Sequence, residues 1–319
     1  MSGARSGVDE IVRAELTRPA PAAVQALADA ARRRHGDAVL AVLFYGSCLR
    51  DATFEGVLDF YVIVDDYRSA YESRALAALN GLLPPNVFYL EHPLGDVVLR
   101  AKAAVMSARD FERGTGPRTL RPGFWARFCQ PAMAVYVRDE RALAEVTRAT
   151  AGAVRTAVSR GLGLVDANAG EARFTSQTLW LSLFRETYAS ELRAESDETV
   201  RSLYAADTAR YDRVLEAALS DLDEAGLARV RREGEIFQLS AAPNLLDRPR
   251  RVRRIGAKLA GVAQLLKSAF TFGDWVPYAL WKLERHTGTR LELSERQRRH
   301  PFLFAWPVFL RVLARRDLR

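Results

Sequence analysis

The sequence predicts an α+β fold in which a mixed-sheet domain is followed by a helical domain and a basic, amphipathic C-terminal region. Two short apolar runs, 38–46 and 57–64, are bounded by glycine or acidic turn residues and predict buried strands. Most of the chain from about 140 to 235 has helical patterning, and basic residues dominate after residue 248. We therefore expect three regions, at 1–140, 141–240 and 241–319.

Each predicted element has its own local signal. Segment 19–36 begins with prolines, ends at a glycine and predicts a helix, whereas 86–92 and 96–107 flank a Pro-Leu-Gly turn and predict a β-hairpin. Three further segments are expected to be helical: 141–164, 175–196 and 206–234. Two prolines and a run of arginines mark 239–254 as a linker.

The charge distribution separates the C-terminal region from the rest of the chain. From residue 248 to the end there are 17 basic and 5 acidic residues, which leaves 30 basic against 34 acidic residues in the first 247. Such a basic end predicts contact with an anionic surface. Two cysteines among 319 residues exclude a disulfide framework and indicate a reducing compartment, and the N-terminus has no apolar core of a secretory signal.

A Gly-Ser turn after the first strand and an aspartate in the second indicate phosphate chemistry. Backbone N–H groups at Gly46 and Ser47 suit triphosphate oxygens, and Asp59, 12 residues after Ser47, can hold Mg²⁺ bridging those phosphates. The usual partner acid two residues further on is replaced by Tyr61. Asp65 lies about 20 Å away along an extended strand, so a second metal ligand must come from another element.

Several segments together resemble one enzyme family. "FYGS" (44–47) and "LDFYVIVDD" (58–66) are similar to the Tyr-Gly-Ser, Leu-Asp-Phe and Val-Asp-Asp motifs of mitochondrial-type phosphatidate cytidylyltransferases, the translocator-maintenance-type CDP-diacylglycerol synthases. In that family the position matching Tyr61 is not acidic either. Further similar segments follow in the family's order: 100–107, 127–131, 174–195 and 253–270. The chain departs from the family at Cys48, at Ala103 and Ala104, and at Glu191, where the family has aspartate, which leaves substrate preference and rate open.

The resemblance implies a nucleotidyltransferase domain followed by a winged-helix-like helical domain, and transfer from CTP to phosphatidate with release of pyrophosphate. Gly46 and Ser47 would cradle the CTP phosphates, and Arg127 would also bind the nucleotide. Asp59 would ligate Mg²⁺ or another divalent cation, with Glu191 as the second acid. The last implied catalytic residue is Lys102, which would balance phosphate charge.

Each of these assignments has a structural alternative. Asp59 alone could be a strand-end turn acid, and Lys102 could only solvate a sheet face beside Arg100. Glu191 could belong to a surface salt-bridge cluster with Arg193 and Glu195, and Arg127 could be structural.

The basic C-terminal region contains a helical stripe suited to a membrane surface. Ile255, Leu259, Val262, Leu266 and Phe270 recur at helical spacing, with three basic residues beside them, Arg254, Lys258 and Lys267. We expect a peripheral protein on the cytoplasmic, inner face of the cell membrane and no transmembrane helix. The alternative is that the stripe packs on the protein's own core.

Two other functions fit parts of the sequence. One is a nucleotidyltransferase with another acceptor: a small molecule, a protein or a nucleic acid. We do not expect a nucleic-acid partner, because the interleaved aromatic and basic pattern of a strand channel is missing from the sequence. The other is a non-catalytic membrane-peripheral adaptor on a degenerate scaffold.

Overall fold

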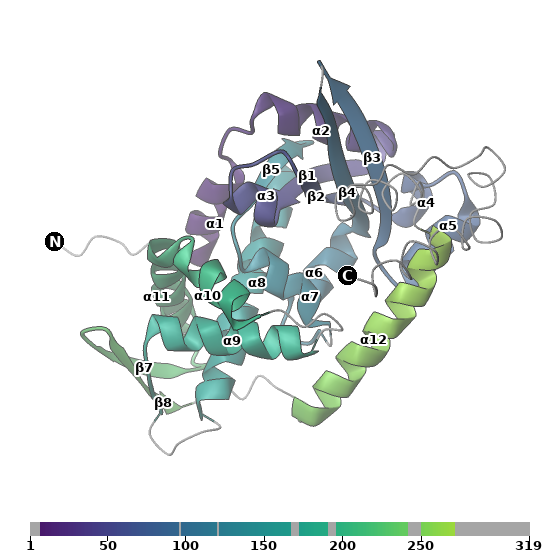
Figure 1. Ribbon diagram of the computed structural model, residues 1–319. Helices are drawn as coiled ribbons and strands as arrows, with labels where there is room; N and C mark the ends of the chain where they lie inside the picture. The colour runs from purple at the N-terminus through teal and green to yellow at the C-terminus, as the bar shows by residue number, and fades with distance from the viewer. Residues whose placement is uncertain are drawn as a thin grey trace, which may run out of the picture. The chain divides into compact units, whose positions relative to one another are not determined.

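The structure is a computed structural model, and it describes residues 7–95, 97–119, 121–166, 172–190, 196–241 and 250–271 (Figure 1). The chain divides into two compact units, 1–271 and 272–319, and every described residue belongs to the first.

A five-stranded mixed sheet forms the N-terminal part of this unit. Its strands run in the order β3-β4-β2-β1-β5; β2 and β4 are parallel, and the other neighbours are antiparallel. Their bounds are β1 (Val39–Tyr45), β2 (Val57–Val64), β3 (Asn86–Leu94), β4 (Val97–Ser107) and β5 (Ala132–Val137). The two predicted strands and the predicted hairpin are confirmed, and so is the α+β class.

Helices cover both faces of the sheet. Strand side chains alternate, so Phe60 and Val62 enter one core with α2 (Ala22–Arg33), whereas Tyr61 and Ile63 enter the other. That second core is formed with α1 (Val8–Leu16), α6 (Ala108–Thr115), α7 (Pro122–Phe128) and α8 (Glu140–Asp166). Short helices complete the connections: η1 (Gly36–Ala38), α3 (Ser47–Arg50), α4 (Tyr67–Ala70) and α5 (Arg74–Leu82).

The helical part also carries a small sheet, which corrects one sequence expectation. Its helices are α9 (Ser176–Ser190), α10 (Asp197–Ala205) and α11 (Thr208–Glu224), and its strands, in spatial order, are β6 (Ala172–Phe174), β8 (Ile236–Ala241) and β7 (Arg229–Glu233). The helix predicted over 206–234 therefore ends early. Gly226, at φ +67°, allows the chain to leave α11, and Gly234, at φ +65°, turns it from β7 into β8.

A buried ion pair joins the helical part to the sheet part. Arg210 on α11 is 1% exposed; its Nε and Nη2 donate to the two carboxylate oxygens of Glu15 on α1, at 2.8 and 3.0 Å. Its Nη1 donates to the carbonyl of Cys129, directly after α7, at 2.6 Å. The two parts also share one apolar core. Residue 140, the expected boundary, lies inside the first compact unit at the start of α8.

The last described element is α12 (Arg250–Thr271), a long helix packed on β3 and α9 (Figure 1). It contains all five positions of the helical stripe that the sequence predicts. The linker expected over 239–254 is wrong at both ends, since 239–241 belongs to β8 and 250–254 to α12, while 242–249 lies outside the described residues. None of the described helices combines the length and the apolarity needed to cross a membrane.

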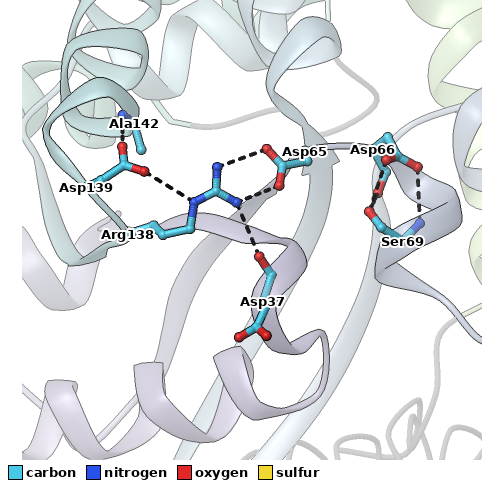
Figure 2. Close-up of polar contacts among 7 residues, drawn as sticks. All are labelled: Asp37, Asp65, Asp66, Ser69, Arg138, Asp139 and Ala142. Carbon is cyan, nitrogen blue, oxygen red and sulfur yellow. Dashed lines mark hydrogen bonds and ion pairs between the residues drawn. The ribbon is translucent and has the colours of Figure 1, made fainter.

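The two aspartates that directly follow β2, Asp65 and Asp66, have structural roles. Arg138, which follows β5, donates two guanidinium hydrogen bonds to the Asp65 carboxylate, at 2.5 and 3.2 Å (Figure 2). Asp66 caps α4, since its Oδ1 accepts from the backbone N–H groups of Arg68 and Ser69 at 2.7 and 3.1 Å. These backbone hydrogen bonds lower the pKa of Asp66. The Asp-Asp pair therefore shapes the exit from β2.

Replacing Asp66 with alanine should lower the free energy of unfolding by about 1 kcal/mol, because two N–H groups of α4 lose their acceptor. Urea unfolding followed by circular dichroism measures the change. Glu72→Ala removes a nearby exposed acid and should have less than half that effect. Equal losses in the two variants would assign the effect to net charge and not to the cap.

Candidate active site

Strand register places three functional side chains in one row across the sheet. Asp59 on β2 pairs with Tyr45 on β1 and, on its other side, with Lys102 on β4. Neighbouring strands lie about 4.8 Å apart, and register partners point to the same face. The acid and the lysine are 43 residues apart in sequence, and the parallel pairing of β2 with β4 makes them lateral neighbours.

The turn after β1 comes close to the Asp59 carboxylate. Gly46 has φ +89° and ψ −163°, a backbone conformation that is essentially restricted to glycine. A Cβ at this position would lie 3.0 Å from Oδ2 of Asp59. The carboxylate therefore lies directly against the Gly-Ser turn, and a side chain at position 46 would collide with it.

A cavity of about 570 Å³ opens over this row. It brings together three of the predicted residues, Asp59, Lys102 and Arg127, and adds Arg121 from the segment before α7. Among the described residues that line it, Asp59 is the only carboxylate, set against three cationic side chains. The apolar and small lining residues include Tyr45, Val87, Ala104, Phe124, Ala257 and Gly261. Such a lining suits an anionic ligand with an apolar portion.

Tyr61, two residues after Asp59 on β2, occupies the position where related sites usually have a second carboxylate, and here it packs in an aromatic cluster. It is 3% exposed and contacts Tyr45 and Phe128 at ring-centroid distances of 5.4 and 5.0 Å. Phe111 and Phe124 lie within 6.3 Å on the same side. A carboxylate here would lose these aromatic contacts and would be largely desolvated, which is costly.

The remaining predicted residues take different positions. Neither Gly46 nor Ser47 is among the described residues that line the large cavity. Gly46 lines a separate cavity of about 130 Å³ with Arg50 and Tyr211, and Ser47 is exposed as the first residue of α3. Behind the turn, burial and the neighbouring Asp59 charge raise the pKa of the Cys48 thiol. Glu191 lies outside the described residues.

A divalent cation fits the donor set of the described residues only in part. Among them no cluster of three or more His, Cys, Asp or Glu side chains could hold a metal ion by itself. Mg²⁺ commonly needs only one or two carboxylates together with substrate phosphates and water. Asp59, which lines the cavity next to the Gly46 turn, can supply one such carboxylate.

One wall of the larger cavity is α12, which is fastened to the turn before β3. Gln264 Nε2 donates to the Pro85 carbonyl at 2.7 Å. Lys267 Nζ donates to the same carbonyl at 2.9 Å and also to that of Leu83. From the opposite side, Arg121 donates to the Pro84 carbonyl. The backbone carbonyls of Leu83, Pro84 and Pro85 thus anchor both α12 and Arg121 at one edge of the cavity. We call this edge the rim.

The predicted membrane-facing residues of α12 divide into different environments. Lys258 is exposed, and three members of the apolar stripe are also exposed: Ile255 at 54%, Leu259 at 66% and Val262 at 45%. Lys267 differs from the expectation, because it is only 9% exposed and its ammonium group serves the rim carbonyls. Arg254 belongs to α12, but its side chain lies outside the described part.

Arg121 and Gln264 were not predicted from the sequence. Pro122 signals a helix start directly after Arg121, but only four of the 47 basic residues are lysines, so one more arginine carries little information. Gln264 lies on the side of α12 opposite the apolar stripe, where helical periodicity predicts solvent. Both positions depend on where α12 packs.

A scan against models of known protein families found no match for the chain, and a search of curated proteins found none. The family resemblance therefore rests on the chain's own motifs and stays a prediction.

Gly46→Ala should destabilise the fold by about 1–3 kcal/mol, through its φ value and the contact with Asp59. A double-mutant cycle separates the two causes. In an Asp59→Ala background the loss should shrink by at least about 0.5 kcal/mol, measured by urea unfolding. Gly234→Ala is the matched control, since its φ is +65° and nothing lies within 4 Å of the added Cβ. Additive effects of Gly46→Ala and Asp59→Ala would contradict the close approach.

Lys267 should titrate well below the ordinary range of a lysine side chain. Burial, and secondly the charge of Arg121, lower the pKa of Lys267 to about 8. With four lysines in the chain, ¹³C-lysine NMR can follow each one, and Lys267→Met identifies the signal. Because the unfolded chain binds this proton more tightly, the unfolding free energy should rise with pH from about 8 to 10.5 in the wild type more than in Lys267→Met. A Lys267 titration near the ordinary lysine value of 10.5 would contradict the buried position.

Proposed function

We propose that this protein is a metal-dependent phosphatidate cytidylyltransferase that converts CTP and phosphatidate to CDP-diacylglycerol and pyrophosphate. The observation that supports this most is a single cavity in which one carboxylate, Asp59, lies among three cations beside the Gly46 turn. A triphosphate and a phosphomonoester are both highly anionic, so their encounter needs such an excess of positive charge. CTP and phosphatidate as the particular substrates follow from the family resemblance.

The reaction asks for positioning and charge neutralisation and not for a strong base. An oxygen of the phosphatidate phosphate attacks the α-phosphorus of CTP and forms the new P–O bond. The bond from the α-phosphorus to the oxygen bridging the β-phosphorus breaks, and pyrophosphate leaves with that electron pair. Because the attacking phosphate is already anionic, Asp59 does not need to remove a proton. Lys102 and Arg127 would offset the charge on the phosphates.

Asp59 would hold a divalent cation such as Mg²⁺, and its position against the Gly46 turn supports this role. When bound, the ion would neutralise the charge that develops as pyrophosphate leaves. Glu191 stays the candidate for a second acidic ligand. Gly46 and Ser47 would contact the triphosphate at the β1 edge of the site.

The orientation of α12 supports a lipid acceptor at a membrane surface. A helix on a water-soluble protein normally turns its large apolar side chains inward. Here Ile255, Leu259 and Val262 point outward, and the inner side presents Ala257 and Gly261 to the cavity. A helix of this kind lying in the headgroup plane would bury the outward stripe, with about 1 kcal/mol from each basic residue near anionic lipid. The protein would then act peripherally, on the inner face of the cell membrane.

Asp59→Asn should lower the rate of CDP-diacylglycerol formation by on the order of 100-fold or more, because the site loses its only described carboxylate. Purified protein is incubated with phosphatidate liposomes, labelled CTP and Mg²⁺, and lipid-borne label is counted. Asp65→Asn makes the same change at the far end of β2, where the side chain pairs with Arg138, and should stay within twofold of wild type.

Three outcomes would redirect the proposal. Unchanged product formation in Asp59→Asn would contradict the assigned site. Metal-dependent CTP binding without lipid product would favour another acceptor. No CTP binding at all, with liposome flotation retained, would favour the non-catalytic adaptor.

A further inference from the structure

The end of the large cavity nearest α12 contains a cation whose charge the described carboxylates do not balance. Arg121 precedes α7, donates to the Pro84 carbonyl and stacks over Phe124 at 4.8 Å from the ring centroid. Burial lowers its pKa, and the neighbouring Arg127 adds to that effect. Among the described residues no Asp or Glu forms an ion pair with Arg121.

Its charged neighbours increase the need for an anion. Arg127 and Lys102 line the same cavity, and Lys267 lies close enough behind the rim for its own pKa to be lowered by Arg121. A partly buried cation among other cations is costly unless an anion joins it. The planar guanidinium matches the geometry of a phosphate, which it can bind through two parallel hydrogen bonds.

The position of Arg121 separates it from the nucleotide end of the site. The Gly46 turn follows β1, whereas α12 packs on β3, and strands β2 and β4 lie between them in the sheet. On the β1 side the cavity is lined by Tyr45, so Asp59 and Lys102 lie between that side and the α12 side. The α12 side, where Arg121 donates to the Pro84 carbonyl, is the part farther from the Gly46 turn.

The wall beside Arg121 is apolar and made of small residues. Pro85 and Val87 line it from the sheet side, and Ala257 and Gly261, one turn apart, line it from α12. Gln264 and Lys267 fix the helix at this distance. A phosphate group joined to an apolar body matches this combination better than a second nucleotide would.

We propose that the α12 end of the cavity is the acceptor subsite, in which Arg121 binds the phosphomonoester of a lipid and Ala257 and Gly261 leave room for its glycerol and acyl portion. This inference rests on the proposed function and assigns the acceptor to its place in the site.

The subsite can be tested with ligands that do not require turnover. Dihexanoyl phosphatidate, glycerol 3-phosphate and Mg·CTP are titrated separately into full-length protein by calorimetry, and KM is measured for the lipid and for CTP. Arg121→Gln should raise the Kd and KM for dihexanoyl phosphatidate by about 10- to 100-fold and leave those for CTP within twofold. Arg118→Gln, an exposed arginine three residues earlier, should change neither.

A second variant tests the small-residue wall without threatening the helix. Gly261→Leu improves helix propensity but fills the cavity, so it should weaken dihexanoyl phosphatidate at least tenfold and leave glycerol 3-phosphate within twofold. Ala263→Leu, on the exposed side of α12, should leave both affinities unchanged. Circular dichroism and the unfolding midpoint verify that every variant is folded, and Arg121→Lys, which keeps the charge, should recover part of the lipid affinity.

The outcomes for the subsite and for the enzyme can be distinguished. Unchanged lipid affinity and KM in Arg121→Gln, with normal product formation in the wild type, would overturn the subsite and leave the enzyme standing. Equal losses for CTP and lipid in folded Arg121→Gln would also overturn it, because they place Arg121 at a shared site. If the wild type forms no product but binds the lipid through Arg121, the subsite stands and the proposed function fails.

Discussion

The register of three strands is the constraint on which this site depends. Antiparallel pairing of β1 with β2 sets Tyr45 opposite Asp59, and parallel pairing of β2 with β4 sets Asp59 opposite Lys102. A slip of one residue in either pair would turn one side chain of the row to the opposite face. Register is strongly specified here because both faces of the sheet are buried under separate cores. The packing of the two cores thus fixes the spacing between the Asp59 carboxylate and the Lys102 ammonium group in the cavity.

The helical part holds the cover of the cavity in place. Arg210 ties α11 to Glu15 on α1 and to the carbonyl that follows α7, the helix that carries Arg127. A fully buried guanidinium is tolerable because a bidentate carboxylate and a carbonyl satisfy it. A buried ion pair contributes little net free energy of folding, but removing one partner would leave the other charge buried and unpaired. Because Arg210 also donates to the carbonyl that follows α7, it helps to hold α7 in position. This link and the shared apolar core join the two parts beside the site.

Charge and shape in the cavity have separate sources. The sheet contributes Asp59 and Lys102, whereas the α7 segment contributes Arg121 and Arg127, and α12 contributes mainly small side chains. The aromatic cluster around Tyr61 keeps the floor apolar, which strengthens electrostatic interactions above it. The outward side of α12 carries large apolar side chains, whereas its inner side presents the small residues Ala257 and Gly261 to a cavity that contains charged groups.

The sequence by itself determined four of the five strands of the larger sheet, the tight turn at Gly46 and the amphipathic character of α12, and it missed β5. These follow from local signals: β-branched and aromatic runs, glycine, and helical periodicity. It could not separate Lys267 from Lys258, because both are lysines on one helix and only packing buries the first against the rim carbonyls. It also gave no reason to single out Arg121 among many arginines. Tertiary structure decided those positions, since the charge a residue meets depends on elements far away in the chain.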